Sequence, residues 1–400
     1  MAEFSDTIKH AQWLRQPLVR EVVEALGANK VKFVGGAVRD CLLGVEVRDI
    51  DVATSLRPEE VVERLKIAGI PVALTGLDHG TVMAHRASFQ IEITSLRADL
   101  ETDGRYAQVE YVDSWERDAE RRDLTINAIY ADHEGNLFDP MKGREDLAAG
   151  KIQFIGDARK RIEEDALRIM RYFRFQAWYG KAEVDHKEFD VVKAHVSMID
   201  RLSIERLRDE LLKLLMASEP LPAVLLMDQA GVLTHLFEAR VDLVALSRSL
   251  QAEKISPDPL RRLAALLPCD LGDVEDFSDR FKLSGLQRKR LLSIAAARIE
   301  LSNNRYGLRA LQFLYGRANL RDAIIIDRAR LMSSWKIITD VIFPLMGRDL
   351  IRLGMEPGKS MGALLDEAKQ QWLDSDCRKS RDELLDFVSD QIRRYRYKNT

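Results

Sequence analysis

Two aspartates separated by one residue, Asp49 and Asp51, have the spacing best suited to chemistry in this sequence. They lie in the run DIDVAT, whose alternation of polar and apolar residues predicts a strand. Side chains two apart on a strand share a face, so both carboxylates would project together while Ile50 and Val52 enter the core. A divalent cation stabilises such a pair of anions, and hard oxygen ligands favour Mg²⁺. Taken alone, such a short pattern more often marks a solvated strand end.

Glu92 is the predicted third carboxylate of this site. It stands between Ile91 and Ile93 in the run QIEIT, which has the alternation of a neighbouring strand. Two metal ions about 3.5–4 Å apart suit in-line phosphoryl transfer. We therefore expect Asp49 and Asp51 to bind two Mg²⁺ ions, with Glu92 assisting.

A glycine pair, Gly35 and Gly36, ends the predicted strand KFVGG and opens the predicted helix AVRDCLLG. Glycines allow the backbone to approach a phosphate closely, and N–H groups at the start of a helix point toward an anion. Arg39 adds donors for phosphate oxygens. A purely structural turn is the alternative. The sequence has neither the GxxxxGK[ST] of a P-loop nor the GxGxxG of a dinucleotide fold at this place, which disfavours both classes.

The elements around these residues predict an α+β fold. Residues 30–140 alternate short strands with a few helices, whereas nearly everything beyond about 155 repeats apolar residues at helical spacing. We expect a mixed-sheet catalytic head followed by an all-helical neck, body and tail. The predicted boundaries are 1–145 for the head, 146–240 for the helical neck and body, and 241–400 for the helical body and tail.

Composition sets limits on the class of protein. The 400 residues carry a formal net charge of −3, so an RNA-binding surface would require basic residues to be concentrated locally. No apolar run approaches the roughly 18 residues that a membrane span requires, and the first residues lack the apolar segment of a signal peptide. Three widely spaced cysteines form no zinc or redox motif. These features predict a cytoplasmic protein without a membrane partner.

Several motifs in order carry a family resemblance: GGAVRDCLLG, RDIDVAT, EITSLR, the stretch from DGRYAQ to RRDLTINAIY, LFDPMKGREDLAAGKI and EEDALRIMRYFRF. Over about residues 31–175 the chain resembles class II tRNA nucleotidyltransferases and bacterial poly(A) polymerases, relatives of the DNA polymerase β superfamily. The resemblance implies template-free transfer of CMP and AMP from CTP and ATP to the 3′ end of tRNA, with release of pyrophosphate. A poly(A) polymerase that adds AMP to RNA 3′ ends is the alternative.

The resemblance also implies roles for two groups of residues that spacing alone leaves open. Arg121, Arg122 and Asp123 would handle the sugar and phosphates of the incoming nucleotide, although an ion pair joining two elements fits the same residues. The second group recurs every three residues on a predicted helix, and a solvated ladder of ion pairs is its alternative. In the family the first two of these side chains read the base, and the others assist: Asp165, Arg168, Arg171 and Arg174.

The base-reading pair has a simple chemical basis. A carboxylate only accepts hydrogen bonds and a guanidinium only donates them. Cytosine and adenine each present an amino donor beside a ring-nitrogen acceptor, which Asp165 and Arg168 can satisfy together. Uracil and guanine present the reverse order and would leave the pair unmatched, and mismatched polar groups reject a substrate strongly.

Three further segments give weaker predictions. Residues 97–118 are a polar stretch where the family has a flexible loop needed for A addition, which favours full CCA activity. The basic and aromatic end QIRRYRYKNT suits RNA contact, although a solvated tail is the alternative. The sequence contains no His–Asp dipeptide, so we expect no phosphohydrolase domain like that of some relatives. The expected partners are the acceptor end of tRNA and nucleoside triphosphates, with no obligate protein partner.

Overall fold

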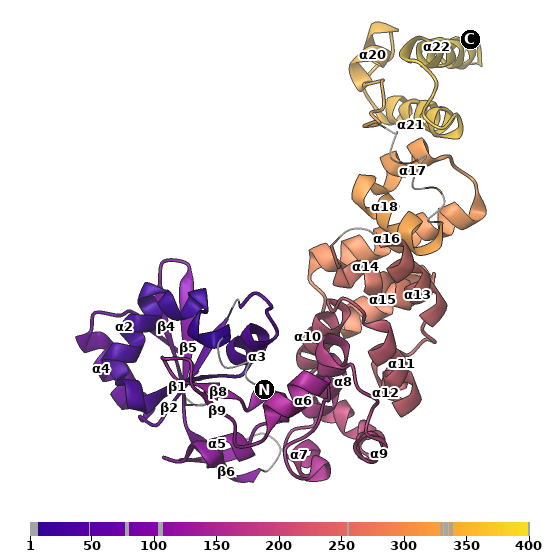
Figure 1. Ribbon diagram of the computed structural model, residues 1–400. Coiled ribbons are helices and arrows are strands. Elements are labelled where there is room, and N and C mark those ends of the chain that lie inside the picture. The colour runs from indigo at the N-terminus through magenta and orange to yellow at the C-terminus, as the bar shows by residue number, and fades with distance from the viewer. Residues whose placement is uncertain are drawn as a thin grey trace. The chain divides into compact units, whose positions relative to one another are not determined.

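The computed structural model describes residues 7–47, 49–76, 80–102, 107–253, 256–328, 331, 335 and 339–398. The chain forms two compact units (Figure 1). The first comprises Met1–Leu214 with Pro222–His235, and the second comprises Leu215–Leu221 with Leu236–Thr400. The mixed-sheet head and the helical remainder that the sequence predicted are both present. The boundaries at 145 and 240 stay predictions.

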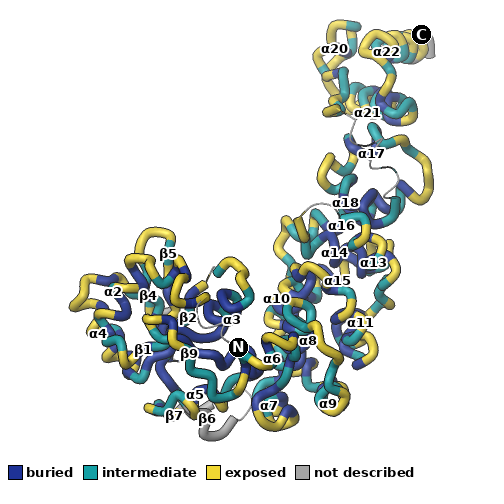
Figure 2. Tube along the Cα trace, viewed as in Figure 1, coloured by how far each residue is buried: buried dark blue, intermediate teal, exposed yellow. Residues whose placement is uncertain are grey.

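A seven-stranded sheet forms the centre of the head, in the order β3-β4-β5-β2-β1-β8-β9. Only β2 and β5 pair in parallel, and the other neighbours are antiparallel. The apolar residues of β1 and β2, at the centre of the sheet, are buried, as the dark segments of both strands in Figure 2 illustrate. The strands are β1 (Val31–Val34), β2 (Ile50–Thr54), β3 (Val72–Gly76), β4 (Thr81–Arg86), β5 (Phe89–Ser95), β8 (Tyr130–Ala131) and β9 (Leu137–Phe138).

Helices complete the head by covering the sheet. Helix α2 (Pro17–Leu26) starts with proline at its first position and buries Leu18, Val22 and Leu26, the apolar stripe that its spacing predicted. It packs with α4 (Pro58–Ile67) and against β4. Helix α3 (Gly36–Leu42) packs on β1 and β2, so it lies next to the start of the Asp51 strand.

The part of the first unit that follows the seven-stranded sheet is helical. Short 3₁₀ turns, η1 (Gln12–Arg15), η2 (Ala28–Lys30), η4 (Thr125–Asn127) and η5 (Val196–Arg201), connect elements of the first unit. The helices after the sheet are α6 (Gly143–Ala149), α7 (Ala158–Glu164), α8 (Leu167–Tyr179), α9 (His186–Ala194), α10 (Ile204–Leu215), α11 (Leu221–Ala230) and α12 (Val232–Leu236). Helix α8 buries an apolar stripe that includes Leu167, Met170 and Phe173, which leaves its polar stripe for other contacts.

The second unit consists of helices in the described residues. They are α13 (Leu243–Ala252), α14 (Pro259–Leu266), α15 (Leu271–Arg280), α16 (Gly285–Asn303), α17 (Leu308–Tyr315), α18 (Arg317–Asp327), α20 (Gly347–Arg352), α21 (Lys359–Asp374) and α22 (Arg381–Lys398). Aspartate side chains cap α13, α14 and α15 by accepting hydrogen bonds from first-turn N–H groups. These caps explain why the helical pattern is divided into separate helices.

Two expectations from the sequence are corrected. The segment around Asp165 is not one helix, because Asp165 has extended backbone (φ −151°, ψ 106°) between α7 and α8. Its carboxylate accepts a hydrogen bond from the N–H of Leu167 at 3.0 Å, which stabilises the break. The described part of 97–118 is not a loop but the two-stranded sheet of β6 (Arg97–Thr102) and β7 (Ala107–Tyr111), followed by α5 (Trp115–Glu120). Residues 103–106 lie outside the described residues.

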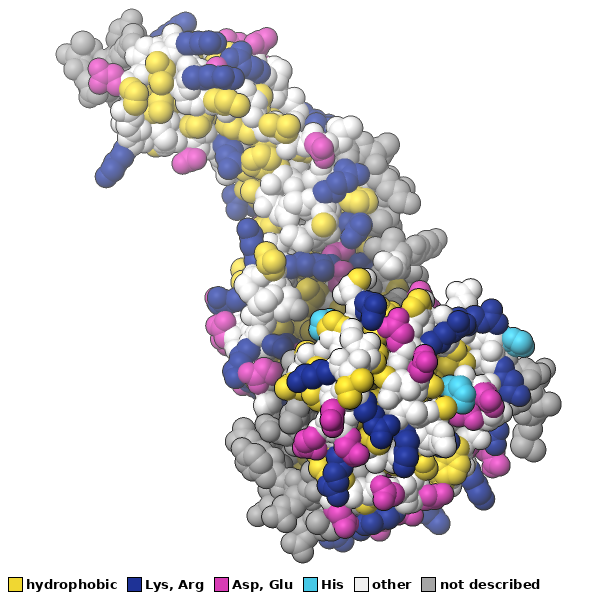
Figure 3. All heavy atoms as spheres, turned by 90° about the vertical axis from the view of Figure 1, so that its left-hand side faces the viewer, with side chains coloured by type: hydrophobic (Ala, Val, Ile, Leu, Met, Phe, Trp, Pro, Cys, Tyr) yellow, Lys and Arg dark blue, Asp and Glu magenta, His cyan; other side chains and the backbone are white. Residues whose placement is uncertain are grey.

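Charge on the surface is mixed in the view of Figure 3, where Lys and Arg side chains alternate with Asp and Glu. Within the described chain, no helix combines the length and apolar character needed to cross a membrane.

Candidate active site

Two of the three predicted carboxylates face each other across neighbouring strands. Asp51 on β2 is in register with Glu92 on β5 in the parallel pair, and register partners project from the same face. Asp49 precedes the first residue of β2 and is exposed. Ile50 and Val52 are each 2% exposed, as the alternating pattern predicted.

The charges of these carboxylates are not balanced. Burial and the charges of Glu92 and Asp49 raise the pKa of Asp51, and Arg122 and Arg39 oppose that rise; the result is a pKa of about 6. In the described part of the chain, no three His, Cys, Asp or Glu side chains are gathered as a metal-binding group. The donor set nevertheless fits a hard cation, because it consists of carboxylate oxygens whose mutual repulsion a cation would relieve.

Gly35 brings the backbone against the Asp51 carboxylate. Its φ of +71° favours glycine, and a Cβ added there would lie 3.5 Å from Oδ2 of Asp51. The turn before α3 therefore meets the carboxylates of β2, as the order of the motifs suggested. Gly36 begins α3 immediately afterwards.

The Arg39 guanidinium, predicted to bind phosphate, already makes several contacts within the protein. It is only 6% exposed, and its guanidinium donates to Asp40 (3.0 Å), Asn127 (2.5 Å) and the hydroxyl of Tyr179 (2.8 Å). It also lies over the Tyr179 ring, 4.3 Å from the centroid. These contacts join α3 to η4 and to the end of α8, so Arg39 links elements as well as carrying charge near the site.

The Arg121–Arg122 pair is held by a buried carboxylate that the sequence analysis did not identify. Asp118 on α5 accepts hydrogen bonds from both arginines and from the hydroxyl of Tyr130. Burial alone would raise the pKa of Asp118, but Arg122, Arg121 and the Tyr130 hydroxyl together lower it to about 2. Asp118 is therefore a carboxylate anion near neutral pH.

Asp123 forms an ion pair with Arg171 of α8, the structural alternative that the sequence allowed. One carboxylate oxygen accepts from Nε and Nη2 of Arg171, both at 2.6 Å, and the other accepts from the Asn127 amide at 3.0 Å. Burial opposes the charge of Asp123, yet Arg171 and these hydrogen bonds lower its pKa well below the usual range. The pair joins the Arg-Arg-Asp segment to α8.

Three predicted arginines converge on one aromatic ring. The guanidinium carbons of Arg174, Arg39 and Arg171 lie 4.3, 5.0 and 5.5 Å from the centroid of Phe175. Burial lowers the pKa of Arg174, Glu210 opposes that effect at 2.6 Å, and the other two arginines add to it. The structure thus brings residues from α3 and α8 into one cationic cluster, which suits a polyanion.

Asp165 and Arg168 do not pair with each other. Asp165 pairs with Arg206 of α10 at 2.8 Å, while Arg168 donates to Glu164 at 2.6 Å and to the carbonyl oxygen of Arg121 at 2.9 Å. Asp165 lies just before α8, and Arg168 is the second residue of that helix. Their predicted cooperation in base reading therefore requires each to meet the base separately rather than as a preformed pair.

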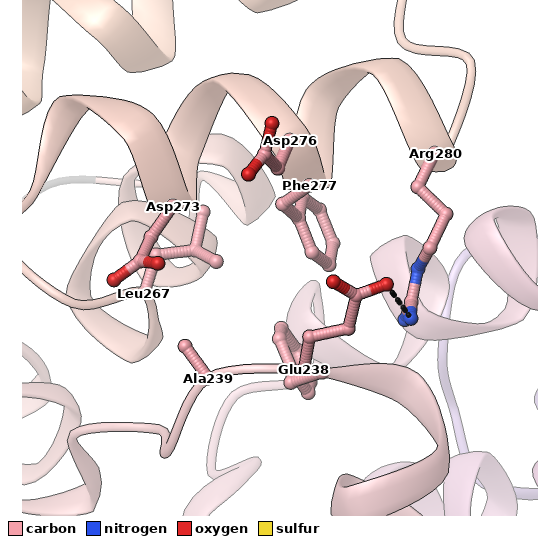
Figure 4. Close-up of a pocket in the computed structure, with 8 residues that line it drawn as sticks. Glu238, Ala239, Leu267, Asp273, Asp276, Phe277 and Arg280 are labelled. Carbon is pink, nitrogen blue, oxygen red and sulfur yellow. Dashed lines mark hydrogen bonds and ion pairs between the residues drawn. The ribbon is translucent and has the colours of Figure 1, made fainter.

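Two cavities in the described residues lie apart from these residues. One of about 40 Å³ in the second unit is lined in part by Glu238, Asp273, Asp276 and Phe277, with Arg280 paired to Glu238 (Figure 4). That volume holds a few waters but no nucleotide. The other, about 350 Å³, lies in the head beside α2. Neither is lined by a predicted site residue.

Comparison with known proteins decides the family. Residues 31–153 match the family model described as the poly A polymerase head domain. Residues 183–241 match the model described as a probable RNA- and SrmB-binding site of polymerase A. The mitochondrial CCA tRNA nucleotidyltransferase 1 of Mus musculus is 34% identical over 388 residues, covering 90% of this chain and 86% of that protein.

The chain belongs to the family of CCA-adding tRNA nucleotidyltransferases.

Other members of this family agree along the chain. A CCA-adding enzyme of Streptococcus pyogenes is 31% identical over 370 residues, covering 88% of this chain and 90% of that protein. The crystal structure of the Bacillus stearothermophilus CCA-adding enzyme in complex with CTP has a TM-score of 0.75 at 25% identity, covering 96% of this chain and all of the other. The family resemblance and the fold class predicted from the motifs are both confirmed.

Several residues of the site were missed by the sequence analysis of this CCA-adding family member. Asp118 had a local signal, since it precedes Arg121 and Arg122 by three and four residues, the spacing of helical ion pairs. Tyr130 lies eight residues from Arg122 and has no helical spacing to it. The remaining missed partners lie 36 or more residues from the side chains that they contact, so they had no local signal: Asn127 and Tyr179 for Arg39, Glu210 for Arg174 and Arg206 for Asp165.

Proposed function

We propose that this chain adds the terminal CCA to tRNA, using CTP and ATP in turn and releasing pyrophosphate. The membership of the family carries this proposal, and the carboxylates at the edge of the glycine turn support it. tRNA and the two nucleotides are accordingly its substrates.

We further propose that Asp49 and Asp51 hold two Mg²⁺ ions, with Glu92 assisting. The support is the unbalanced charge of Asp51, which is partly buried and lies in register with a second carboxylate. Magnesium bound there would lower the pKa of the tRNA 3′-hydroxyl and neutralise charge on the phosphates.

The chain's own residues have separate tasks in this proposal. Gly35 and Gly36 let the backbone approach the triphosphate beside Asp51, and Arg121, Arg122 and Asp123 orient its phosphates and sugar. The guanidinium groups of Arg39, Arg171 and Arg174 supply hydrogen-bond donors for the departing pyrophosphate. These arginines each already have a carboxylate partner, which fixes their positions before the nucleotide enters.

Base selection is proposed to depend on Asp165 and Arg168. Asp165 is about one-third exposed, and its pair with Arg206 is also accessible, with side-chain exposures of 36% and 48%. An exposed pair of this kind is worth little, about 0–1 kcal/mol, so Asp165 can exchange Arg206 for a base amino group at small cost. Arg168 would donate to the ring nitrogen of the same base.

The cytoplasmic location remains a prediction. Cys41, Cys269 and Cys377 are free thiols, which fits a reducing compartment. The Mus musculus relative is named as mitochondrial.

A single assay tests the proposed function. A tRNA that lacks CCA is incubated with Mg²⁺ and each labelled nucleoside triphosphate, alone and in combination. We expect two CMP additions followed by one AMP, and no UMP or GMP. Repeated AMP addition without CMP would instead identify a poly(A) polymerase, and no incorporation at all would reject the proposal.

A further inference from the structure

Three side chains donate hydrogen bonds to the carboxylate of Asp118 on α5: Arg121, Arg122 and Tyr130. Its Oδ1 accepts from Nε and Nη2 of Arg121 at 2.8 and 2.6 Å. Its Oδ2 accepts from Nε and Nη2 of Arg122 at 3.2 and 3.0 Å, and from the Tyr130 hydroxyl at 2.7 Å. The Asp118 side chain is 1% exposed. One buried carboxylate therefore fixes two guanidinium groups and is itself fixed by a tyrosine.

This arrangement occupies only one edge of each guanidinium. Arg121 and Arg122 both use their Nε–Nη2 edge toward Asp118, and no hydrogen bond involves either Nη1 amine among the residues that the structure describes. The two side chains retain 16% and 19% exposure. An arginine bound by one edge has a fixed orientation, and its remaining donors can still bind a phosphate.

The two arginines also connect to the rest of the site. The charge of Arg122 opposes the rise in the pKa of the Asp51 carboxyl, so the two groups interact electrostatically. The carbonyl oxygen of Arg121 accepts a hydrogen bond from Arg168 at 2.9 Å, which joins this segment to the start of α8. A shift of the pair would therefore change the position of charge beside Asp51 and beside the base-selecting residues.

We propose that Asp118, supported by Tyr130, is a positioning residue that orients Arg121 and Arg122 so that their free amines bind the phosphates of the incoming nucleotide. This inference rests on the proposed function, because it concerns the same nucleotide site. Two adjacent guanidinium groups repel each other, and the shared carboxylate offsets that repulsion while holding both in place. When a nucleoside triphosphate binds, the two arginine side chains are already ordered, so binding loses no further conformational entropy from them.

The test compares Asp118→Asn with the wild type. The amide keeps the shape of the carboxylate but loses its charge, so both arginines lose their fixed orientation. We expect the KM for CTP and ATP, and the Kd for CTP with Mg²⁺ in the absence of tRNA, to rise about tenfold to a hundredfold. The KM for tRNA should change by less than about twofold, because the substitution leaves the RNA contacts in place. An equal rise in both KM values, or an unchanged CTP Kd, would overturn the proposal.

A double-mutant cycle separates positioning from a merely structural role. Because Asp118 also holds Arg121, the double variant Asp118→Asn/Arg122→Lys should bind CTP more weakly than Arg122→Lys alone, but by less than the product of the two single losses. A loss of CTP affinity in the double variant equal to the product of the two single losses would contradict the proposal. If melting shows that Asp118→Asn does not fold, Tyr130→Phe replaces it in the same cycle, with an expected rise of about twofold to fivefold in CTP Kd. An unchanged CTP Kd in a folded Tyr130→Phe, or losses that multiply in its cycle, would count against the proposal.

Glu110→Gln is the matched control. It breaks the exposed ion pair, at 3.2 Å, between Glu110 of β7 and Arg117 of α5. Neither Arg121 nor Arg122 takes part in that pair. CTP affinity should stay within about twofold of wild type, as for exposed pairs generally. The CTP-binding measurement also distinguishes two failures. A wild type that binds CTP but adds no nucleotide to tRNA would defeat the proposed function, whereas the Asp118 variants would still test the positioning role.

Discussion

Glu253 in the second unit and Asp51 in the head are two carboxylates with opposite electrostatic surroundings. In the second unit, Glu253 is 4% exposed and accepts hydrogen bonds from both Arg261 and Arg262, which are almost completely buried. Arg262 also donates to the carbonyl oxygens of Leu215 and Ala217 at 2.5 Å. In the head, Asp51 lies beside a second carboxylate with no cation bonded to it among the described residues.

The pKa values record this difference. Burial opposes ionisation of Asp258 in the second unit, but the hydrogen bond from Arg290 lowers its pKa. Burial and Glu92 raise the pKa of Asp51 to about 6. Balanced buried charges hold helices together, whereas unbalanced charges leave free energy that a bound cation can recover. Charge matching, rather than the number of charges, therefore distinguishes the network around Glu253 from the predicted metal-binding carboxylates Asp51 and Glu92.

The substitution Asp51→Asn tests most directly whether the unbalanced carboxylate serves catalysis rather than stability. Losing one metal-binding carboxylate should raise the activation free energy by several kcal/mol. The rate of CMP incorporation should therefore fall on the order of 10³-fold or more. The melting temperature without metal should be unchanged or higher, because one of the neighbouring like charges is gone. Incorporation assays and thermal melts measure the two effects, with Glu63→Gln on the exposed part of α4 as control. Retained activity would remove Asp51 from the mechanism.

Glu253→Gln should have the opposite profile. It leaves two buried guanidinium groups without their carboxylate, and breaking such a pair costs about 3–5 kcal/mol of unfolding free energy. Urea unfolding followed by tryptophan fluorescence measures the loss. Glu275→Gln, which removes the exposed partner of Arg288 in the same unit, should cost about 0–1 kcal/mol. Equal effects of the two substitutions would show that matching at Glu253 does not stabilise the unit.

Glu188 extends the comparison to pH. Burial raises its pKa to about 7; one of its oxygens accepts from the N–H of Phe154 at 3.2 Å, and the other has no partner in the described chain. A raised folded pKa favours the protonated state, so this contribution to stability is complete below about pH 4.5 and is lost as pH rises through 7.

The corresponding substitution is Glu188→Gln, which remains neutral at all pH values. It should stabilise the protein by about 2–3 kcal/mol at pH 8 relative to the wild type, with little difference at pH 5. Unfolding curves at both pH values provide the measurement. Glu183→Gln, at an exposed position near α9, should show no such pH dependence. A difference that is the same at pH 5 and pH 8 would contradict the assignment.

The smallest expected effect concerns a matched but exposed pair. Asp165→Ala should raise UMP incorporation relative to CMP by about tenfold or more, because the base loses the acceptor for its amino group. Competition between CTP and UTP on tRNA lacking CCA measures the ratio. Asp209→Ala, which removes the exposed partner of Arg208 on α10, is the control. Unaltered discrimination against UTP would refute the role of Asp165.

The sequence determined the elements and the candidate residues, because both depend on local pattern. Alternation predicted the strand of Asp51, helical spacing predicted α2, and the order of motifs predicted the family. The break at Asp165 was missed because helical spacing continues across it, while a side-chain hydrogen bond to Leu167 ends the helix. The strands β6 and β7 were missed because their polar composition does not reveal cross-strand pairing.

Tertiary structure decided which charges are matched. Asp123 meets Arg171, Arg39 meets Tyr179, and Arg174 meets Glu210 across dozens of residues, so no local pattern could assign these partners. Asp51 and Glu92 carry the same side-chain charge as Glu253, and only packing leaves the first two beside each other while surrounding the third with arginines. The reason is physical: the free energy of a charge depends on what lies within a few ångströms of it after folding, and sequence spacing does not fix those distances.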